Sequence, residues 1–161
     1  MGGGVWSDGA GIQGAFMLDA FFQPVSGFDL PRFAGVPTFM RLPHVGFDHP
    51  RFSEVEIGLI GAPWDGGTTN RPGARHGPRQ LRDASTMIRA VNGATWVAPF
   101  QLARCADLGD VAPNPGDLMD TMARMEAFYA RVVEAGIRPL TGGGDHLCSL
   151  PILRAVAKSR P

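Results

Sequence analysis

Short apolar runs recur along the last two-thirds of the chain, and each is followed by a segment with helical spacing. Residues 55–61 form an apolar run that ends at glycine and is followed by Pro63, which predicts a strand that leads into a loop. Residues 104–110 and 137–141 predict two further strands on the same grounds.

A helix is predicted after each of these strands. Pro78 stands where a helix accepts proline in its first turn, and residues 79–91 continue with helical spacing. Residues 150–158 predict a last helix, with Pro151 in its first turn.

The helix over residues 117–135 has the clearest pattern. Asp117 can cap its start and Gly136 can close its end. Apolar residues recur at intervals of three and four, as expected of one buried helix face. This stripe consists of Leu118, Met122, Met125, Tyr129 and Val132. Met119 is also expected to pack in the core.

The alternation of strands and helices predicts an α/β protein with a mainly parallel sheet and helices on both faces. Ligands of such sheets gather at the carboxyl ends of the strands. The loops at 62–77, 108–116 and 142–149 are therefore the expected location of the chemistry. A sheet edge left unpaired after the last helix would indicate that more strands belong to the fold.

The N-terminal part of the chain has a different composition. Residues 1–50 are rich in glycine, proline and phenylalanine, which predicts an extended arm with short turns. Its apolar side chains need a surface, either the domain formed by residues 51–161 or a neighbouring subunit.

Composition excludes several classes of function. Fifteen Lys and Arg balance 15 Asp and Glu, so no charge excess favours nucleic acid or an anionic membrane as partner. Two cysteines without a CxxC motif indicate no disulfide framework. The first 20 residues contain no Lys or Arg, and no apolar run approaches the roughly 20 residues that span a bilayer. A cytoplasmic protein is expected.

The strongest local signal for chemistry is Gly-Gly-Gly-Asp-His at residues 142–146. His146, on a tight turn after a strand, is placed to bind a metal, with Asp145 as a supporting group behind the ligand. The alternatives are a capping aspartate beside a structural histidine, or a phosphate cradle without the usual Lys-Ser/Thr. A nucleophile pair of His146 and Cys148 is disfavoured because residues two apart do not share a helix face.

The second signal is the loop that begins at Asp65 and is rich in glycine, threonine and arginine. Asn70 and Arg71 are candidates for binding a substrate carboxylate. The alternative is a loop held by its own salt bridges, and for Arg79 and Arg82 a solvated helix face is favoured.

Three segments together resemble one known family. Residues 61–79, beginning Gly-Ala-Pro-Trp-Asp-Gly-Gly, resemble the N-terminal signature loop of agmatinases and guanidinobutyrases. Residues 106–111 resemble their second strand and its exit, and residues 139–155 resemble their first metal motif. The likeness extends into the arm at residues 23–27 and 30–35. In this order, the segments identify the chain as resembling the N-terminal half of a ureohydrolase of the arginase and agmatinase family.

This resemblance implies a three-layer α/β/α fold and a pair of Mn²⁺ ions that activate water to release urea from a guanidino compound. His146 then matches one metal ligand. The later motifs that carry the other ligands have no match here, so the resemblance places no catalytic residue in this chain and implies a truncated, inactive fragment. A homo-oligomer, trimer or hexamer, is implied for the full-length protein, in arginine and polyamine metabolism. The alternatives are a non-catalytic assembly module or a truncated pseudo-enzyme.

Overall fold

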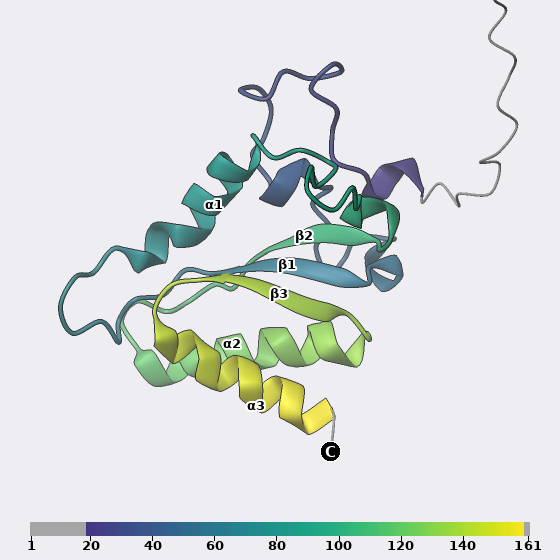
Figure 1. The fold of residues 1–161 in the computed structure, drawn as a ribbon. Helices are drawn as coiled ribbons and strands as arrows, with labels where there is room; N and C mark the ends of the chain where they lie inside the picture. Colours follow the sequence, from purple (N-terminus) through teal and green to yellow (C-terminus); the bar gives the residue numbers. More distant parts are fainter. Residues whose placement is uncertain (1–18, 160–161) are drawn as a thin grey trace, which may run out of the picture.

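A three-stranded parallel sheet lies at the centre of the computed structural model, which describes residues 19–159 (Figure 1). The strands are β1 (Ile57–Ala62), β2 (Cys105–Asp110) and β3 (Arg138–Gly143), in the order β2-β1-β3. Register aligns Leu59 of β1 with Asp107 on one side and Leu140 on the other. The three carboxyl ends therefore lie at one edge of the sheet, as the sequence predicted.

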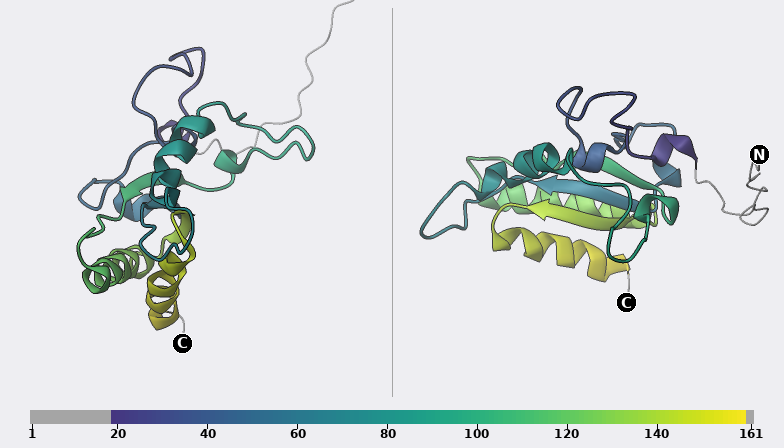
Figure 2. Two further views of the ribbon diagram at one scale, coloured as in Figure 1. Left: turned by 90° about the vertical axis from the view of Figure 1, so that its left-hand side faces the viewer. Right: turned by 45° about the horizontal axis from the view of Figure 1, so that its top comes forward.

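Helices cover both faces of this sheet (Figures 1 and 2). Helices α2 (Leu118–Glu134) and α3 (Ser149–Ser159) pack against each other on one face, while α1 (Gly77–Ser85) lies on the other. The predicted three-layer α/β/α arrangement is confirmed. Parallel strands buried on both faces read as continuous apolar runs, which is the pattern that β1 shows.

Each face has its own hydrophobic cluster. On the α2 and α3 face, Ile60 and Leu108 pack with Met125, Tyr129 and Val132 of α2. The predicted α2 stripe is confirmed at these three positions and at Met122, which is also buried. The Asp117 carboxylate caps the helix by accepting from the Asp120 N–H at 3.0 Å.

Two predictions for α2 were wrong. Leu118 is 43% exposed and Met119 is 72% exposed. Both lie in the first turn, where the helix extends beyond the sheet that the middle of α2 covers (Figure 1). Periodicity shows which side chains share a face but not how far the opposing layer reaches.

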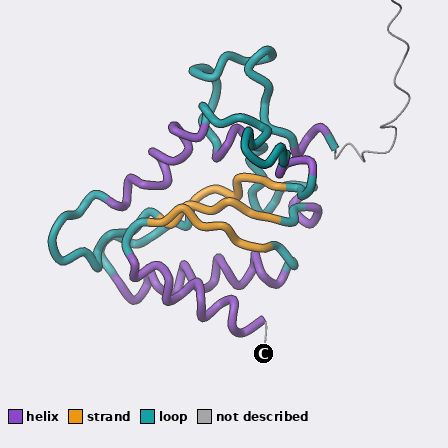
Figure 3. Tube along the Cα trace, viewed as in Figure 1, coloured by secondary structure: helices purple, strands orange, loops and turns teal. Residues whose placement is uncertain are grey.

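The second cluster lies on the opposite face and joins the arm to β1, β2 and the segment before β2. Phe39 and Leu42 of the arm are buried against Leu59, Phe100 and Cys105. The arm runs in loops with 3-10 turns at Ala20–Phe22 and Phe39–Arg41 (Figure 3). Its apolar residues fall into two groups: Phe39 and Leu42 are buried, whereas Phe28 and Phe33 are fully exposed. The glycine-rich start of the predicted arm, at 1–18, lies outside the described residues.

Helix α1 and strand β3 differ in length from the predictions. Helix α1 ends at Ser85 instead of residue 91, and the arm residue Arg32 donates to the carbonyls of Met87 and Ile88 just beyond it. Strand β3 continues through Gly143 because Gly142 and Gly143 still pair with β1. The described residues include no helix long and apolar enough to cross a membrane.

A candidate metal-ligand turn at the carboxyl edge of the sheet

The turn that follows β3 packs directly against the backbone that follows β1. The Gly144 N–H donates to the Ala62 carbonyl at 2.9 Å, and the Asp145 N–H donates to the Trp64 carbonyl at 2.8 Å. A Cβ on Gly144 would lie 1.7 Å from the Trp64 carbonyl oxygen, far inside van der Waals contact. Only glycine fits at this position, so the close approach of the two backbones explains why residue 144 of the glycine motif is a glycine.

Asp145 connects this turn to the loop after β1. Its Oδ1 accepts from the Leu147 N–H at 3.0 Å, which caps the 3-10 turn His146–Cys148 that leads into α3. Its Oδ2 accepts from the Gly67 N–H at 2.7 Å, across 78 residues of sequence. The carboxylate thus fixes the backbone on both sides of the turn.

The His146 side chain is exposed and makes no hydrogen bond to any residue between 19 and 159. It follows directly after Asp145, so its backbone is held while its ring remains accessible. The Cys148 thiol is buried, and burial raises its pKa, which disfavours the thiolate that a nucleophile would need. The structure therefore gives no support to a Cys-His pair.

The loop after β1 is held by its own salt bridge, as one of the sequence interpretations expected. The buried Asp65 carboxylate accepts from Arg75 Nε at 2.6 Å and from the Gly73 N–H at 2.6 Å. Hydrogen bonds from Arg75 and Gly73 lower the pKa of Asp65 to about 2, so the carboxylate is charged at neutral pH.

Asn70 and Arg71 lie on the exposed part of the same loop. Neither side chain has a hydrogen-bond or ion-pair partner within the described part of the chain. Their donors are therefore free to meet a ligand. Beside this loop, a cavity of about 430 Å³ is lined by Trp64, His76 and Arg79 together with Asp110 at the end of β2.

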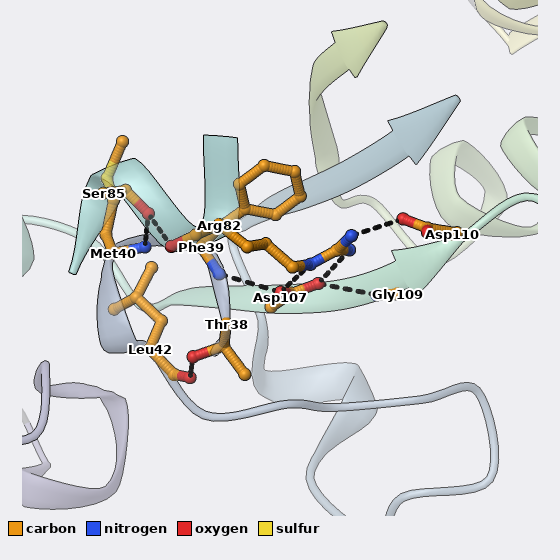
Figure 4. A network of polar contacts seen from close by, with 9 residues as sticks. All are labelled: Thr38, Phe39, Met40, Leu42, Arg82, Ser85, Asp107, Gly109 and Asp110. Atoms are coloured by element: carbon orange, nitrogen blue, oxygen red, sulfur yellow. Dashed lines mark hydrogen bonds and ion pairs between the residues drawn. The ribbon is translucent and has the colours of Figure 1, made fainter. Parts of the chain in front are cut away.

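The sequence analysis missed a buried polar network on the α1 face (Figure 4). Asp107 of β2 accepts from Arg82 Nε and Nη2, at 2.7 and 2.9 Å, and from the Phe39 N–H at 2.9 Å. Arg82 also donates to Asp110 at 2.6 Å and lies over the Phe39 ring. The prediction of a solvated Arg82 was wrong, because its side chain is only 13% exposed. An aspartate within an otherwise apolar strand was the available signal.

The described residues fit one metal-ligand position but not a complete metal centre. No three His, Cys, Asp or Glu side chains between residues 19 and 159 lie close enough to hold a metal ion. The carboxylates near the strand ends already have partners, since Asp65 binds Arg75 and Asp110 binds Arg82. The exposed histidines His76 and His146 remain as candidate donors near this edge, and a metal needs several protein ligands.

Comparison with known proteins places this geometry in a family. A model described as the arginase family matches residues 55–161. Guanidinopropionase from Pseudomonas aeruginosa is 53% identical over 139 residues, which cover 86% of this chain and 42% of that protein. The solved structure of proclavaminate amidinohydrolase from Streptomyces clavuligerus matches with a TM-score of 0.73 and 39% identity, over 80% of this chain and 41% of that one.

A formiminoglutamase variant from Trypanosoma cruzi, solved with Mn²⁺, matches with a TM-score of 0.62 and 27% identity, over 71% of this chain and 39% of that one. The parallel sheet and these matches define a three-layer α/β protein. The chain belongs to the arginase family, which confirms the resemblance. It spans about two-fifths of the length of these relatives.

Proposed function

We propose that this chain forms the N-terminal part of a Mn²⁺-dependent hydrolase that releases urea from a small guanidino compound. One observation carries the proposal: the His146 ring is exposed and has no partner among residues 19–159, on a turn whose backbone Asp145 holds from both sides. Such a ring can offer a neutral nitrogen to a metal without first breaking a hydrogen bond. The relative solved with Mn²⁺ supports the choice of ion.

A bound manganese ion, with His146 as one of its ligands, would supply an activated water as nucleophile at neutral pH. The chain's own contribution is positional. Gly144 lets the turn approach β1, Asp145 orients it, and His146 serves as one ligand. Since the described residues supply no second ligand, no catalytic step is assigned to this chain, and the 161 residues alone are proposed to be inactive.

For the substrate, we propose a guanidino acid such as 3-guanidinopropanoate or 4-guanidinobutanoate in preference to agmatine. These compounds differ at the end remote from the guanidino group, where the acids carry a carboxylate. Arg71 and Asn70 present donors that no other described residue engages and that suit this carboxylate. The identity to a guanidinopropionase supports the same choice.

A second candidate function is subunit assembly, which the exposed arm favours. Phe28 and Phe33 are fully exposed on the part of the arm that projects from the α1 face (Figure 1). Exposed aromatic side chains of this kind are enriched in protein interfaces. A homo-oligomeric, cytoplasmic full-length protein, with the arm at residues 1–50 in subunit contacts, is consistent with this reading.

Urea release tests the proposed function. Residues 1–161 alone are expected to release no urea from any of the three compounds with Mn²⁺. The same residues fused to the part of P. aeruginosa guanidinopropionase that follows the matched segment are expected to release it. In this fusion, Arg71→Gln should raise KM for 3-guanidinopropanoate by about tenfold, the value of one charge-assisted hydrogen bond.

The matched control is Arg138→Gln, which removes an exposed arginine at the start of β3, the opposite end of the strand from the carboxyl edge, and is expected to leave KM unchanged. An equal effect of both variants would refute the role of Arg71. Turnover by residues 1–161 alone, abolished by His146→Ala, would contradict the proposal that this chain needs further ligands.

A further inference from the structure

The cavity of about 430 Å³ beside the loop after β1 lies where this loop, the end of β2 and the start of α1 meet. Its walls are largely apolar, since four prolines and a tryptophan line it: Pro63, Trp64, Pro78, Pro113 and Pro115. Because proline fixes its own backbone, walls of this kind keep their shape when no ligand is bound. The volume suits a small molecule.

The polar side chains of this cavity are mainly basic. Arg75, His76 and Arg79 line it together with one carboxylate, that of Asp110. The Asp110 carboxylate already accepts from Arg82 Nη1 at 2.6 Å (Figure 4). Arg75 is paired with the buried aspartate of the loop after β1. His76 and Arg79 are exposed, and their side chains have no hydrogen-bond or ion-pair partner among residues 19–159. Their donors are available to an anion.

The start of α1 adds to this preference for an anion. His76 precedes the helix and its side chain makes no capping hydrogen bond, and the first turn contains no acidic residue. Pro78 and Arg79, in that first turn, line the cavity. The N-terminal end of a helix carries partial positive charge and amides without intrahelical partners, and both attract anions.

Trp64 gives an independent indication of a ligand. It is only 8% exposed, and its indole Nε1 is buried without a hydrogen-bond partner in the part of the chain that the structure describes. Such donors are rare in folded proteins, because a buried donor that makes no hydrogen bond costs free energy. Trp64 lines the cavity, so an acceptor bound there can satisfy this N–H.

We propose that this cavity binds the phosphate or carboxylate group of a small organic anion. The anionic group accepts hydrogen bonds from Arg79, His76 and the Trp64 indole, and it lies at the positive end of α1. The proline walls enclose the apolar part of the molecule. Neither His146 nor Arg71 lines this cavity. Binding therefore requires neither metal nor a guanidino group, and the proposal goes beyond the proposed hydrolysis.

Titration of the full chain with inorganic phosphate and, separately, with propanoate tests the proposal. Isotope-labelled protein without metal is followed by nuclear magnetic resonance, with sodium chloride at the same ionic strength as reference. The Trp64 indole N–H signal and the amide signals at the start of α1 are expected to shift, with a dissociation constant of about 1 mM or tighter. Tighter binding of phosphate would assign the cavity to phosphorylated compounds, and tighter binding of propanoate would assign it to carboxylic acids.

Arg79→Gln locates the binding site. It is expected to weaken binding of the preferred anion by about tenfold, the value of one charge-assisted hydrogen bond. Because the Arg79 side chain is exposed, this variant should fold as the unaltered chain does. The matched control is Arg89→Gln, which removes an exposed arginine beyond the other end of α1 and should leave binding unchanged.

Three results would overturn the proposal. The first is no shift of the Trp64 indole signal with either anion at about 10 mM, well above the expected dissociation constant. The second is an equal shift with chloride, and the third is equal weakening by Arg79→Gln and Arg89→Gln, which would indicate attraction to positive charge in general. These measurements involve no turnover, so a failure here is distinguishable from a failure of the proposed hydrolysis.

Discussion

Replacement of Gly144 by alanine is expected to destabilise the protein by about 3–5 kcal/mol, near the upper end for single substitutions. The new Cβ would lie 1.7 Å from the Trp64 carbonyl oxygen and 2.6 Å from its carbon. Backbone atoms cannot rotate away as a side chain can, so the exits of β1 and β3 must separate. The hydrogen bond from the Asp145 N–H to the Trp64 carbonyl would then be lost. Urea denaturation monitored by circular dichroism measures the change.

Gly143→Ala is the matched control for this prediction. It lies next to Gly144 in the same glycine run, but a Cβ there meets no atom within 4 Å, and its backbone does not require glycine. The free energy of unfolding should change by no more than about 1 kcal/mol. It can even increase, because alanine restricts the unfolded chain more than glycine does. Equal destabilisation by both variants would contradict the close approach at Gly144.

Asp107→Ala is expected to destabilise the protein by about 3–5 kcal/mol, because it leaves the Arg82 guanidinium buried without its main partner. Burial raises the pKa of Asp107, but hydrogen bonds from Arg82, Phe39 and Gly109 outweigh it and hold the pKa below its ordinary value. The contribution of Asp107 is therefore present above the ordinary carboxyl pKa and lost as the pH falls through the lowered one. Urea denaturation at pH 7 measures the loss.

Asp110→Ala shows how much of the effect depends on burial. It removes a second carboxylate from the same arginine, but from a side chain that is 42% exposed. This substitution should lower the free energy of unfolding by about 0–1 kcal/mol, which is typical for the loss of a partly exposed ion pair. In Asp107→Ala, hydrogen exchange at the Phe39 amide should also accelerate, since that amide donates to the missing carboxylate. A smaller effect of Asp107→Ala than of Asp110→Ala would contradict the network in Figure 4.

The sequence predicted the elements whose causes are local. Apolar runs and helical spacing gave all three strands and helices, and Asp117 marked the start of α2. The glycine run indicated a sharp turn, and the structure supplies its reason in the backbone of Trp64. These features follow from neighbouring residues and so are visible in a single sequence.

The features that the sequence did not predict depend on partners distant along the chain. Arg82 pairs with Asp107 across 25 residues, and the same carboxylate receives the Phe39 N–H across 68. The early end of α1 involves Arg32, more than 50 residues earlier. The role of Asp145 also required the fold, since its partner Gly67 lies 78 residues away. No pattern of spacing reveals such pairs.

The central claim is that the imidazole of His146 is a manganese ligand once the remaining ligands are present. The most direct measurement is the Mn²⁺ content of the fusion of residues 1–161 to the C-terminal part of P. aeruginosa guanidinopropionase, determined by atomic absorption after dialysis. We expect His146→Ala to lower the bound Mn²⁺, while His76→Ala, which removes another exposed histidine, leaves it unchanged. Equal manganese content in the His146→Ala fusion and the unaltered fusion would contradict it.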